Sequence, residues 1–137
     1  MKIILDKGAF MPVRGHKHDA GLDLRTPVPA TIMPGKSVTI DTGVHVEIKP
    51  RFVGMLKSKS GLNVKHGITS EGVIDAGYTG SIVAKLFNHG NEAVTFKPGD
   101  KITQLVILPV YIPKKMRVTV RFKKTERGNG GFGSTGR

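Results

Sequence analysis

Apolar and polar residues alternate along most of the chain with the period of two that is typical of half-buried β-strands. The clearest stretch spans residues 30 to 48, and turns at Pro34-Gly35 and Thr42-Gly43 divide it. Its alternating apolar positions are Val38, Ile40, Val44, Val46 and Ile48. We therefore predict several short strands here, joined by tight turns.

The same alternation predicts strands over residues 52–56, 82–87, 93–96 and 118–122, the last with one basic face. Residues 88–91 are expected to join two of these strands, 82–87 and 93–96, as a hairpin. The nearly continuous apolar run 102–108 predicts a strand that is covered on both faces. Helical periodicity is confined to one or two turns at 61–66. The pattern predicts an all-β protein.

Length and composition agree with one β-rich domain. The chain has 137 residues, with 18 Gly and 8 Pro that favour turns over long helices. It has no Cys, which excludes a disulfide scaffold, a thiolate zinc site and a cysteine nucleophile. No apolar run is long enough for a signal peptide or a membrane-spanning helix. We expect a cytoplasmic protein without a membrane partner.

The charge balance points to anionic partners. Lys and Arg number 22 against 10 Asp and Glu, for a net charge of +12, which attracts both nucleotide phosphates and nucleic acids. The composition changes after Phe122, because residues 123–137 are rich in Gly and contain one large apolar residue, Phe132. We predict a barrel domain over 1–122 and a flexible arm over 123–137.

Two motifs are interpreted as ordinary loops. Residues 30–37 match a relaxed phosphate-loop pattern, but that motif needs a helix to begin at its Lys, and a strand pattern follows instead. Residues 16–19, His-Lys-His-Asp, could offer metal ligands. Without a further cluster of ligands a solvated loop is the better interpretation. We therefore predict a β-turn at 30–37 and no metal site at 16–19.

Other segments leave two interpretations open. Asp75 follows an apolar strand at the tip of an expected hairpin, where it could act as a general base or belong to a plain turn. Cations and hydroxyls alternate over 57–60 before Gly61, which suits phosphate oxygens or a charged turn. Asp23 lies between two apolar residues, as a buried structural acid or an indirect metal contact. The arm fits a tail, a nucleic-acid segment or a lid.

Five motifs in order resemble those of the homotrimeric deoxyuridine triphosphate nucleotidohydrolases, the dUTPases, over nearly the whole chain. They are the segments at residues 20–24, 59–62, 72–80, 98–105 and 127–136. The resemblance implies a distorted β jelly-roll, or β-clip barrel, with three protomers sharing three active sites. It implies Mg²⁺-dependent hydrolysis of dUTP to dUMP and pyrophosphate, which limits uracil incorporation into DNA and supplies dUMP for dTMP synthesis.

The resemblance also implies roles for single residues. Asp75 corresponds to the general base that activates water for attack on the α-phosphorus, and Asp23 to the acid that holds Mg²⁺ through water. Tyr78 corresponds to the ring that packs on deoxyribose and excludes a 2′-hydroxyl. The backbone slot for uracil corresponds to Gly72, Val73, Ile74 and Val83.

The phosphates are expected to contact the second and fourth motifs and the arm. The corresponding residues of the body are Lys59, Ser60, Gly61 and Gln104. In the arm, Arg127 would bind the γ-phosphate and Phe132 would cover the uracil. The segment that closes over the phosphates corresponds to Gly133, Ser134 and Thr135.

Two departures from the family pattern leave alternatives. Lys59 stands where most members carry Arg, so we expect weaker phosphate binding. Gly77 replaces an acid before Tyr78, as in the related dCTP deaminases, but the position of the deaminase Glu holds Lys85. A non-enzymatic basic β-module that binds single-stranded nucleic acid is the other alternative. Few and scattered aromatic residues argue against a nucleic-acid partner.

Overall fold

A computed structural model of the chain describes residues 1–131, and these form ten strands and one helix. The elements in chain order are β1 Ile3–Leu5, β2 Gly21–Arg25, β3 Ala30–Ile32, β4 Ser37–Asp41, β5 Val44–Val46, β6 Phe52–Lys57, α1 Ser60–His66, β7 Ile68–Ile74, β8 Val83–Asn88, β9 Val94–Phe96 and β10 Lys101–Pro109. The prediction of an all-β protein is confirmed, and so is the short helix.

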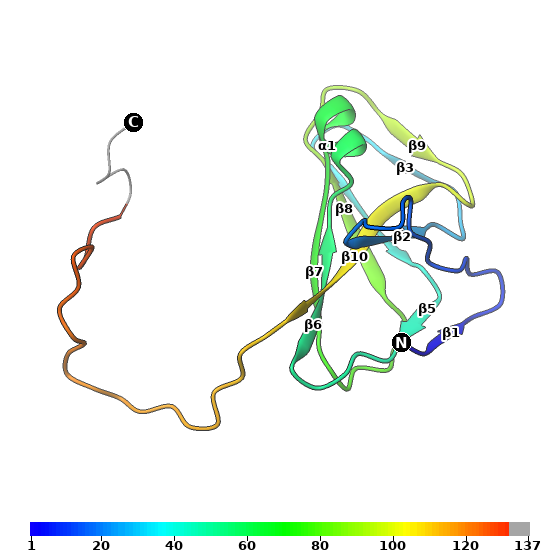
Figure 1. Cartoon of the computed structure of the whole chain (residues 1–137). Helices are drawn as coiled ribbons and strands as arrows, with labels where there is room; N and C mark the ends of the chain where they lie inside the picture. The colour runs from blue at the N-terminus through cyan, green and yellow to red at the C-terminus, as the bar shows by residue number, and fades with distance from the viewer. Residues whose placement is uncertain (132–137) are drawn as a thin grey trace.

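The strands form one large sheet and two small ones (Figure 1). The large sheet has six strands in the order β2-β10-β6-β7-β8-β4, and β1-β5 and β3-β9 form two-stranded sheets. Every pair is antiparallel. The sheets curl around one apolar core, so strands from both halves of the sequence share it.

The core is built from the inward positions of alternating strands. In β8 buried residues at positions 84, 86 and 88 alternate with exposed ones, as the sequence pattern predicts. Full burial of a Leu or Ile side chain contributes about 1.5–3 kcal/mol each to stability. The largest apolar side chains that are almost completely buried are Leu24, Ile32, Ile40, Leu56, Ile68, Ile82, Leu86, Ile102 and Leu105.

The predicted hairpin at residues 88–91 is wrong. β8 pairs with β4 and β7, whereas β9 pairs with β3. The side chain of buried Asn88 explains the change of sheet. Its Nδ2 donates to the carbonyls of Ile32 and Glu92, both at 2.8 Å, and its Oδ1 accepts from the backbone N–H of Gly90 at 2.9 Å. These bonds hold the chain against β3 as it leaves β8.

The predicted strand at 118–122 is also wrong. The last strand ends at Pro109, and residues 110–131, here called the tail, run away from the body without a regular element (Figure 1). The apolar residues Val118, Val120 and Phe122 are 103%, 101% and 90% exposed. A strand needs a partner for its backbone groups and apolar face, and the body of the same chain provides none for the tail.

The turn predicted within 30–37 is confirmed at residues 33–36, because these lie between strands β3 and β4 and no helix follows them. Gly35 occupies the left-handed region with φ of 68°, and the N–H of Lys36 donates to the carbonyl of Met33 at 3.0 Å. Residues 16–19 form the predicted exposed loop. In the part of the chain that the structure describes, no helix has the length and apolar character to cross a membrane.

Candidate active site

Four polar side chains lie in a row across one face of the large sheet. Asp23 of β2 pairs with Gln104 of β10, Gln104 with Lys57 of β6, and Lys57 with Glu71 of β7. Residues directly opposite one another on neighbouring strands share a face and are in contact range. Lys57 forms an ion pair with Glu71 at 2.8 Å, and Gln104 Nε2 donates to the carbonyl of Ser58 at 3.1 Å. Strand register therefore assembles this row.

Asp23 is the centre of charge in this row. Only 6% of the residue is exposed, Lys101 Nζ lies 2.7 Å from its Oδ2, and Lys59 Nζ contacts its Oδ1. Burial raises the pKa of the Asp23 carboxyl, but hydrogen bonds from Lys101 and Lys59 and their positive charges outweigh it, so the net pKa is lowered. Asp23 is thus held as a carboxylate between two ammonium groups.

Lys101 is a residue of the site that the sequence analysis missed. It lies three positions before Gln104 in the sequence, so regular alternation would place the two on opposite faces of β10. The pairing of β10 with β2 shifts between Lys101 and Thr103, which marks a β-bulge. The extra residue returns Lys101 to the face of Gln104 and Asp23. Only the cross-strand register reveals this placement, since a bulge leaves no reliable sequence signal.

The turn from β6 into α1 completes a cationic cleft of about 530 Å³, which we call the lysine cleft. Lys59 precedes the first helical residue, and the exposed Ser60 and Gly61 begin the helix. A Cβ atom on Gly61 would meet open space, so the backbone there is accessible. The lining residues are Gly15, His16, Asp19, Ala20, Gly21, Asp23, Lys57, Lys59, Ser60, Lys101, Gln104 and Val106.

Gly21 makes room for one of these side chains. A Cβ atom at this position would overlap the amide of Gln104, so any larger residue would displace it. Gly21 is buried on β2 and lies opposite Val106 in the register. The glycine of the first motif therefore positions the glutamine of the fourth. The structure brings together the predicted residues Asp23, Lys59, Ser60 and Gln104, with Gly61 beside them at the start of α1.

Asp75 and Tyr78 lie elsewhere, in the loop 75–82 that joins β7 to β8, here called the hairpin loop. Asp75 directly follows β7 and is exposed, and the N–H of Tyr78 donates to its carbonyl at 3.1 Å. Gly77, at the third position of this turn, has φ of +93°. A residue with a side chain is strained there, which gives a structural reason for glycine in place of the acid usual in the family pattern.

Tyr78 folds back over the hairpin loop. Its hydroxyl donates to the carbonyl of Ser81 at 3.0 Å, and a Cβ atom on Gly80 would overlap the phenol group. The side chain is nevertheless about half exposed. Val73 and Val83 are exposed on the two strands beside it. An apolar surface therefore surrounds the loop that carries Asp75.

The two strands that lead to the hairpin loop separate before they reach it. β7 and β8 pair only from Ile68 to Ser70 and from Leu86 to Asn88. Beyond this point Gly72, Val73 and Ile74 keep β6 as their partner, and Val83 keeps β4. The backbone edges that face one another across the fork make no ladder pairs. Such edges offer alternating donors and acceptors to a planar ligand.

Within one chain the lysine cleft and the hairpin loop are far apart. Asp75 lies four residues beyond Glu71 in the direction of β7, and Glu71 is three strands from Asp23. At about 3.3 Å per residue and about 4.8 Å per strand, Asp75 and Asp23 are separated by roughly 20 Å along the sheet. One chain therefore does not bring the two predicted groups together.

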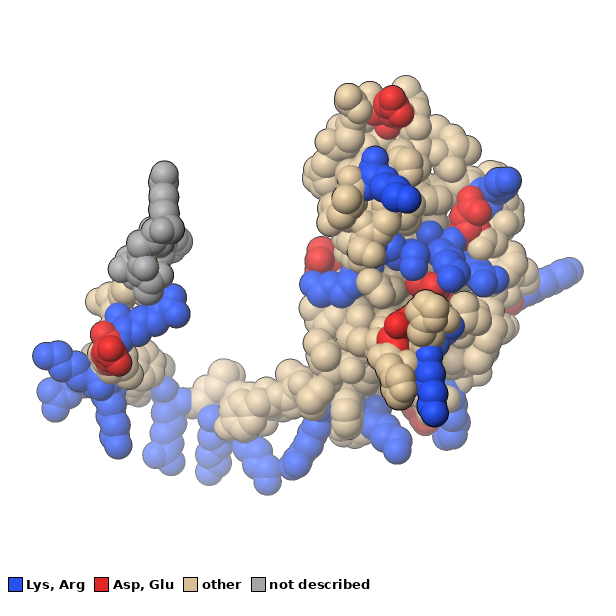
Figure 2. Space-filling model, turned by 45° about the horizontal axis from the view of Figure 1, so that its top comes forward, with Lys and Arg blue, Asp and Glu red and all other residues tan. Residues whose placement is uncertain are grey.

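The arm is described only as far as Gly131. Arg127 is exposed in the tail, away from the body, and its Nε donates to the carbonyl of Gly130 at 3.0 Å (Figure 1). Lys and Arg side chains project along the length of the tail (Figure 2). The remaining predicted contacts of the arm, Phe132, Gly133, Ser134 and Thr135, lie outside the described residues.

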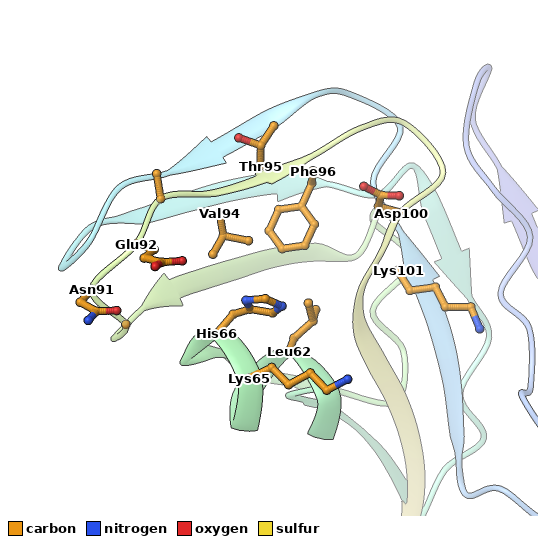
Figure 3. A pocket seen from close by; sticks show the side chains of 12 residues that line it. Leu62, Lys65, His66, Asn91, Glu92, Val94, Thr95, Phe96, Asp100 and Lys101 are labelled. Atoms are coloured by element: carbon orange, nitrogen blue, oxygen red, sulfur yellow. The ribbon is translucent and has the colours of Figure 1, made fainter.

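A second hollow, of about 500 Å³, lies between α1 and β9 (Figure 3). Leu62 and His66 of the helix face Val94 and Phe96 of the strand across it. Lys101 is the residue that the linings of this hollow and the lysine cleft share. The hollow therefore meets the candidate site at Lys101, and none of the site residues predicted from the sequence lines it.

Comparison with known proteins decides the family. A family model described as dUTPase matches residues 7–136. The chain belongs to the dUTPase family. A deoxyuridine 5′-triphosphate nucleotidohydrolase from Anaeromyxobacter sp. is 45% identical over 121 residues, which cover 86% of this chain and 82% of that protein. One from Clostridium kluyveri is 42% identical over 135 residues, covering 96% and 94%.

Solved dUTPase structures show the same fold. A mutant dUTPase of Staphylococcus bacteriophage 80alpha, with dUpNHpp, has a TM-score of 0.92 and 30% identity, covering 99% of this chain and 98% of that one. A mutant dUTPase from phage phi11 of S. aureus, with a structural Mg(II) ion, has a TM-score of 0.81 and 28% identity, covering 90% and 98%. The jelly-roll prediction is confirmed.

The same comparisons favour the hydrolase over the deaminase alternative. The chain's family model and its curated relatives are dUTPases. Lys85, at the position of the deaminase acid, is exposed on β8 with its ammonium 5.1 Å from the centre of the Phe87 ring. A lysine held in this way offers no carboxylate for proton transfer.

Proposed function

We propose that this dUTP diphosphatase of the dUTPase family hydrolyses dUTP to dUMP and pyrophosphate in sites that three copies of the chain share. One observation carries the proposal. The lysine cleft suits a triphosphate and the hairpin loop suits a nucleoside, yet roughly 20 Å of sheet separates them in one chain. A second copy must then bring its hairpin loop to the cleft, as in a closed symmetric oligomer.

The lysine cleft binds the phosphates in this proposal. Lys59 and Lys101 supply positive charge, and Ser60 supplies a hydroxyl beside the accessible backbone of Gly61. Gln104 supplies an amide that Gly21 holds in place. Phosphoryl transfer depends mainly on positioning and on neutralising charge, so a cleft of this composition suits it.

The residues present also fit Mg²⁺ on the triphosphate. Both oxygens of Asp23 are engaged by lysines, which leaves this acid to act on an ion through water rather than by direct ligation. No group of three His, Cys, Asp or Glu residues that could hold a metal occurs among residues 1–131. The phosphates would thus supply most ligands. When bound, the ion neutralises charge on the phosphate oxygens.

The hairpin loop and the fork behind it select the nucleoside. The unpaired backbone edges of Gly72, Val73, Ile74 and Val83 would hydrogen-bond uracil, and Tyr78 would pack against deoxyribose and leave no space for a 2′-hydroxyl. Cytosine would leave backbone groups without hydrogen-bond partners, which can favour uracil over cytosine by ~10⁴ in kcat/KM. Binding affinity alone can favour uracil over thymine, which differs by one methyl, by only ~10². The narrow fork must therefore reject thymine by steric exclusion.

Asp75 supplies the proton acceptor. Its carboxylate orients a water molecule and takes a proton from it as the water oxygen bonds to the α-phosphorus. The bond from the α-phosphorus to the bridging oxygen breaks, and pyrophosphate leaves with the bonding electrons. The exposed carboxylate at the start of the hairpin loop is free to face a neighbouring copy's cleft.

The arm would close the site from a further copy. Arg127 would bind the γ-phosphate through its planar fork, Phe132 would cover the uracil, and the segment 133–135 would lie over the phosphates. The described tail supports this role, because it extends away from its own body with its apolar and basic side chains exposed. Closure would exclude bulk water from the reaction.

Phosphorus NMR on dUTP, dTTP, dCTP and UTP, with and without Mg²⁺, tests the proposal. We expect pyrophosphate release from dUTP in the presence of Mg²⁺ and almost none from the other three. Equal turnover of UTP would contradict the role given to Tyr78. Release of inorganic phosphate instead of pyrophosphate would contradict attack at the α-phosphorus.

A further inference from the structure

The far side of the hairpin loop is held by the corner between β4 and β5. Thr42 Oγ1 donates to the carbonyl of Ile82 at 2.7 Å, and Ser81 Oγ contacts Asp41 Oδ1. The third contact joins His45 Nδ1 to the carbonyl of Thr79 at 2.7 Å. Thr79 directly follows Tyr78, so this contact holds the backbone beside the residue that carries the aromatic ring.

The imidazole of His45 faces two oxygen acceptors. A carbonyl can only accept, so Nδ1 carries a proton when it contacts Thr79. Its buried Nε2 lies 3.3 Å from Oδ1 of Asp6, close enough for an ion pair but outside good hydrogen-bond geometry. A carboxylate at this distance favours a proton on Nε2 as well. The geometry thus suits the doubly protonated, positively charged ring.

We propose that His45 is a positioning residue, whose imidazolium joins Thr79 to Asp6 and thereby fixes Tyr78 for nucleoside selection. The inference rests on the proposed role of the hairpin loop. His45 touches no substrate and acts only through the loop backbone. The anchor is firm because the N–H of Asp6 donates to the carbonyl of Gly43 at 2.9 Å, which ties Asp6 to the same β4–β5 corner.

Charged groups from three elements surround His45 and agree with this arrangement. They are Asp6 after β1, Asp41 of β4, and the ion pair of Lys2 with Glu47 beside the ring. The hydrogen bond to Thr79 is the largest cause that raises the pKa of His45, followed by Asp6, while burial lowers it. The net pKa lies above its usual value, so the ring is charged below that pKa.

The direction of the pH effect follows. Below the raised pKa both contacts are present, and as pH rises through it one proton leaves. The nitrogen that loses it then presents a lone pair to an acceptor, and the link between Thr79 and Asp6 breaks. We expect the KM for dUTP to rise with pH over this range, while kcat changes less. Loss of one hydrogen bond of this kind should raise KM about three- to tenfold.

Two substitutions of His45 test the inference. His45→Ala should raise the KM for dUTP about three- to tenfold at pH 6 and lower the preference for dUTP over UTP by a similar factor. In His45→Asn the amide nitrogen occupies the place of Nδ1, donates to Thr79 and does not titrate. It lacks the contact with Asp6, so at pH 6 its KM should lie between those of the wild-type protein and His45→Ala, and it should lack the rise with pH that titration of His45 causes. Because the phosphates of dUTP also titrate, each KM is divided by that of the wild-type protein at the same pH.

His89→Ala is the matched control, since His89 is exposed at the far end of β8 and contacts Thr69 rather than the hairpin loop. The KM of His89→Ala divided by that of the wild-type protein should stay near one at every pH. The midpoint of an NMR titration of the His45 imidazole should equal the midpoint of the pH dependence of the wild-type KM. Asp6→Asn should lower both midpoints by the same amount. Unequal shifts of the two midpoints would overturn the inference.

Tyr78→Ala separates this inference from the proposed function. If Tyr78→Ala raises the KM for dUTP but His45→Ala does not, the inference about His45 is wrong and the role of the hairpin loop stands. If neither variant changes KM or the preference for dUTP over UTP, the role of the hairpin loop is wrong, and the inference fails with it.

Discussion

The lysine cleft and the hairpin loop differ in how they are held. The cleft lies on adjacent strands of one sheet, and its central acid is 6% exposed between two lysines of the same chain. The hairpin loop projects beyond a fork between strands, with Asp75 and Tyr78 exposed. The cleft is complete in one chain, whereas the hairpin loop needs something placed against it.

Under the proposed function, this difference explains how one short chain makes a specific enzyme site. Strand register would organise the charge that binds the phosphates, because cross-strand pairs fix side chains on one face. Selection of the base and sugar would fall to a loop that another copy approaches. The proposal therefore makes activity depend on assembly as well as on folding.

The largest effect is expected from Asp75→Asn, which removes the proposed proton acceptor but keeps the size of the side chain. We expect kcat to fall by about 10²- to 10⁴-fold, the usual contribution of general-base catalysis. Thermal unfolding should be unchanged, because Asp75 is exposed. Glu92→Gln, an exposed acid outside the site, should keep the wild-type rate. A wild-type kcat for Asp75→Asn would refute the assignment.

Removal of residues 127–137 addresses the arm. We expect kcat/KM for dUTP to fall about 10²-fold, since a charged donor to the reacting phosphates is lost. The melting temperature should stay the same, because residues 110–129 are exposed and contribute nothing to the core. Calorimetry and steady-state kinetics on the same preparation measure both. Full activity of the truncated chain would show that the arm is only a tail.

Mixing two inactive variants tests whether the cleft and the hairpin loop come from different copies. Asp75→Asn and Lys59→Gln are co-expressed with different tags, and complexes carrying both tags are isolated. If neighbouring copies supply the two parts, about a third of the sites in a closed trimer that carries both tags would combine an intact cleft with an intact hairpin loop. We expect about a third of the wild-type rate. A rate no higher than that of either variant alone would place both parts in one chain.

Much of the fold could be predicted from the sequence, because period-two alternation reports burial on a sheet directly. The strands around Ile40, Leu86 and Leu105 are examples. The change of sheet after Asn88, where the sequence predicted a hairpin, could not be predicted, since the carbonyl of Ile32 that Asn88 binds is distant in sequence. The alternation at 118–122 marks apolar and polar positions, but a strand also needs a partner for its backbone, which alternation does not report.

Less of the candidate site than of the fold could be predicted from the sequence. Motif resemblance located Asp23, Lys59 and Gln104, which the structure brings together. Lys101 escaped because a bulge reverses its face, and His45 escaped because its role depends on contacts with Thr79 and Asp6 from separate loops. Side chains that act through tertiary contacts leave no periodic signal in the sequence.

The smallest expected effect is a gain, from Lys59→Arg. Lys59 contacts Asp23 as a point charge, whereas a planar guanidinium can hold a carboxylate or a phosphate with two parallel bonds. We expect the KM for dUTP to fall about threefold with kcat nearly unchanged, because one better hydrogen bond is worth about 0.5–1.5 kcal/mol. Lys65→Arg, on an exposed position of α1, should leave both constants as they are. A higher KM for Lys59→Arg would mean that the cleft, with Lys101 already beside Asp23, is fitted to an ammonium group and has no space for a wider cation.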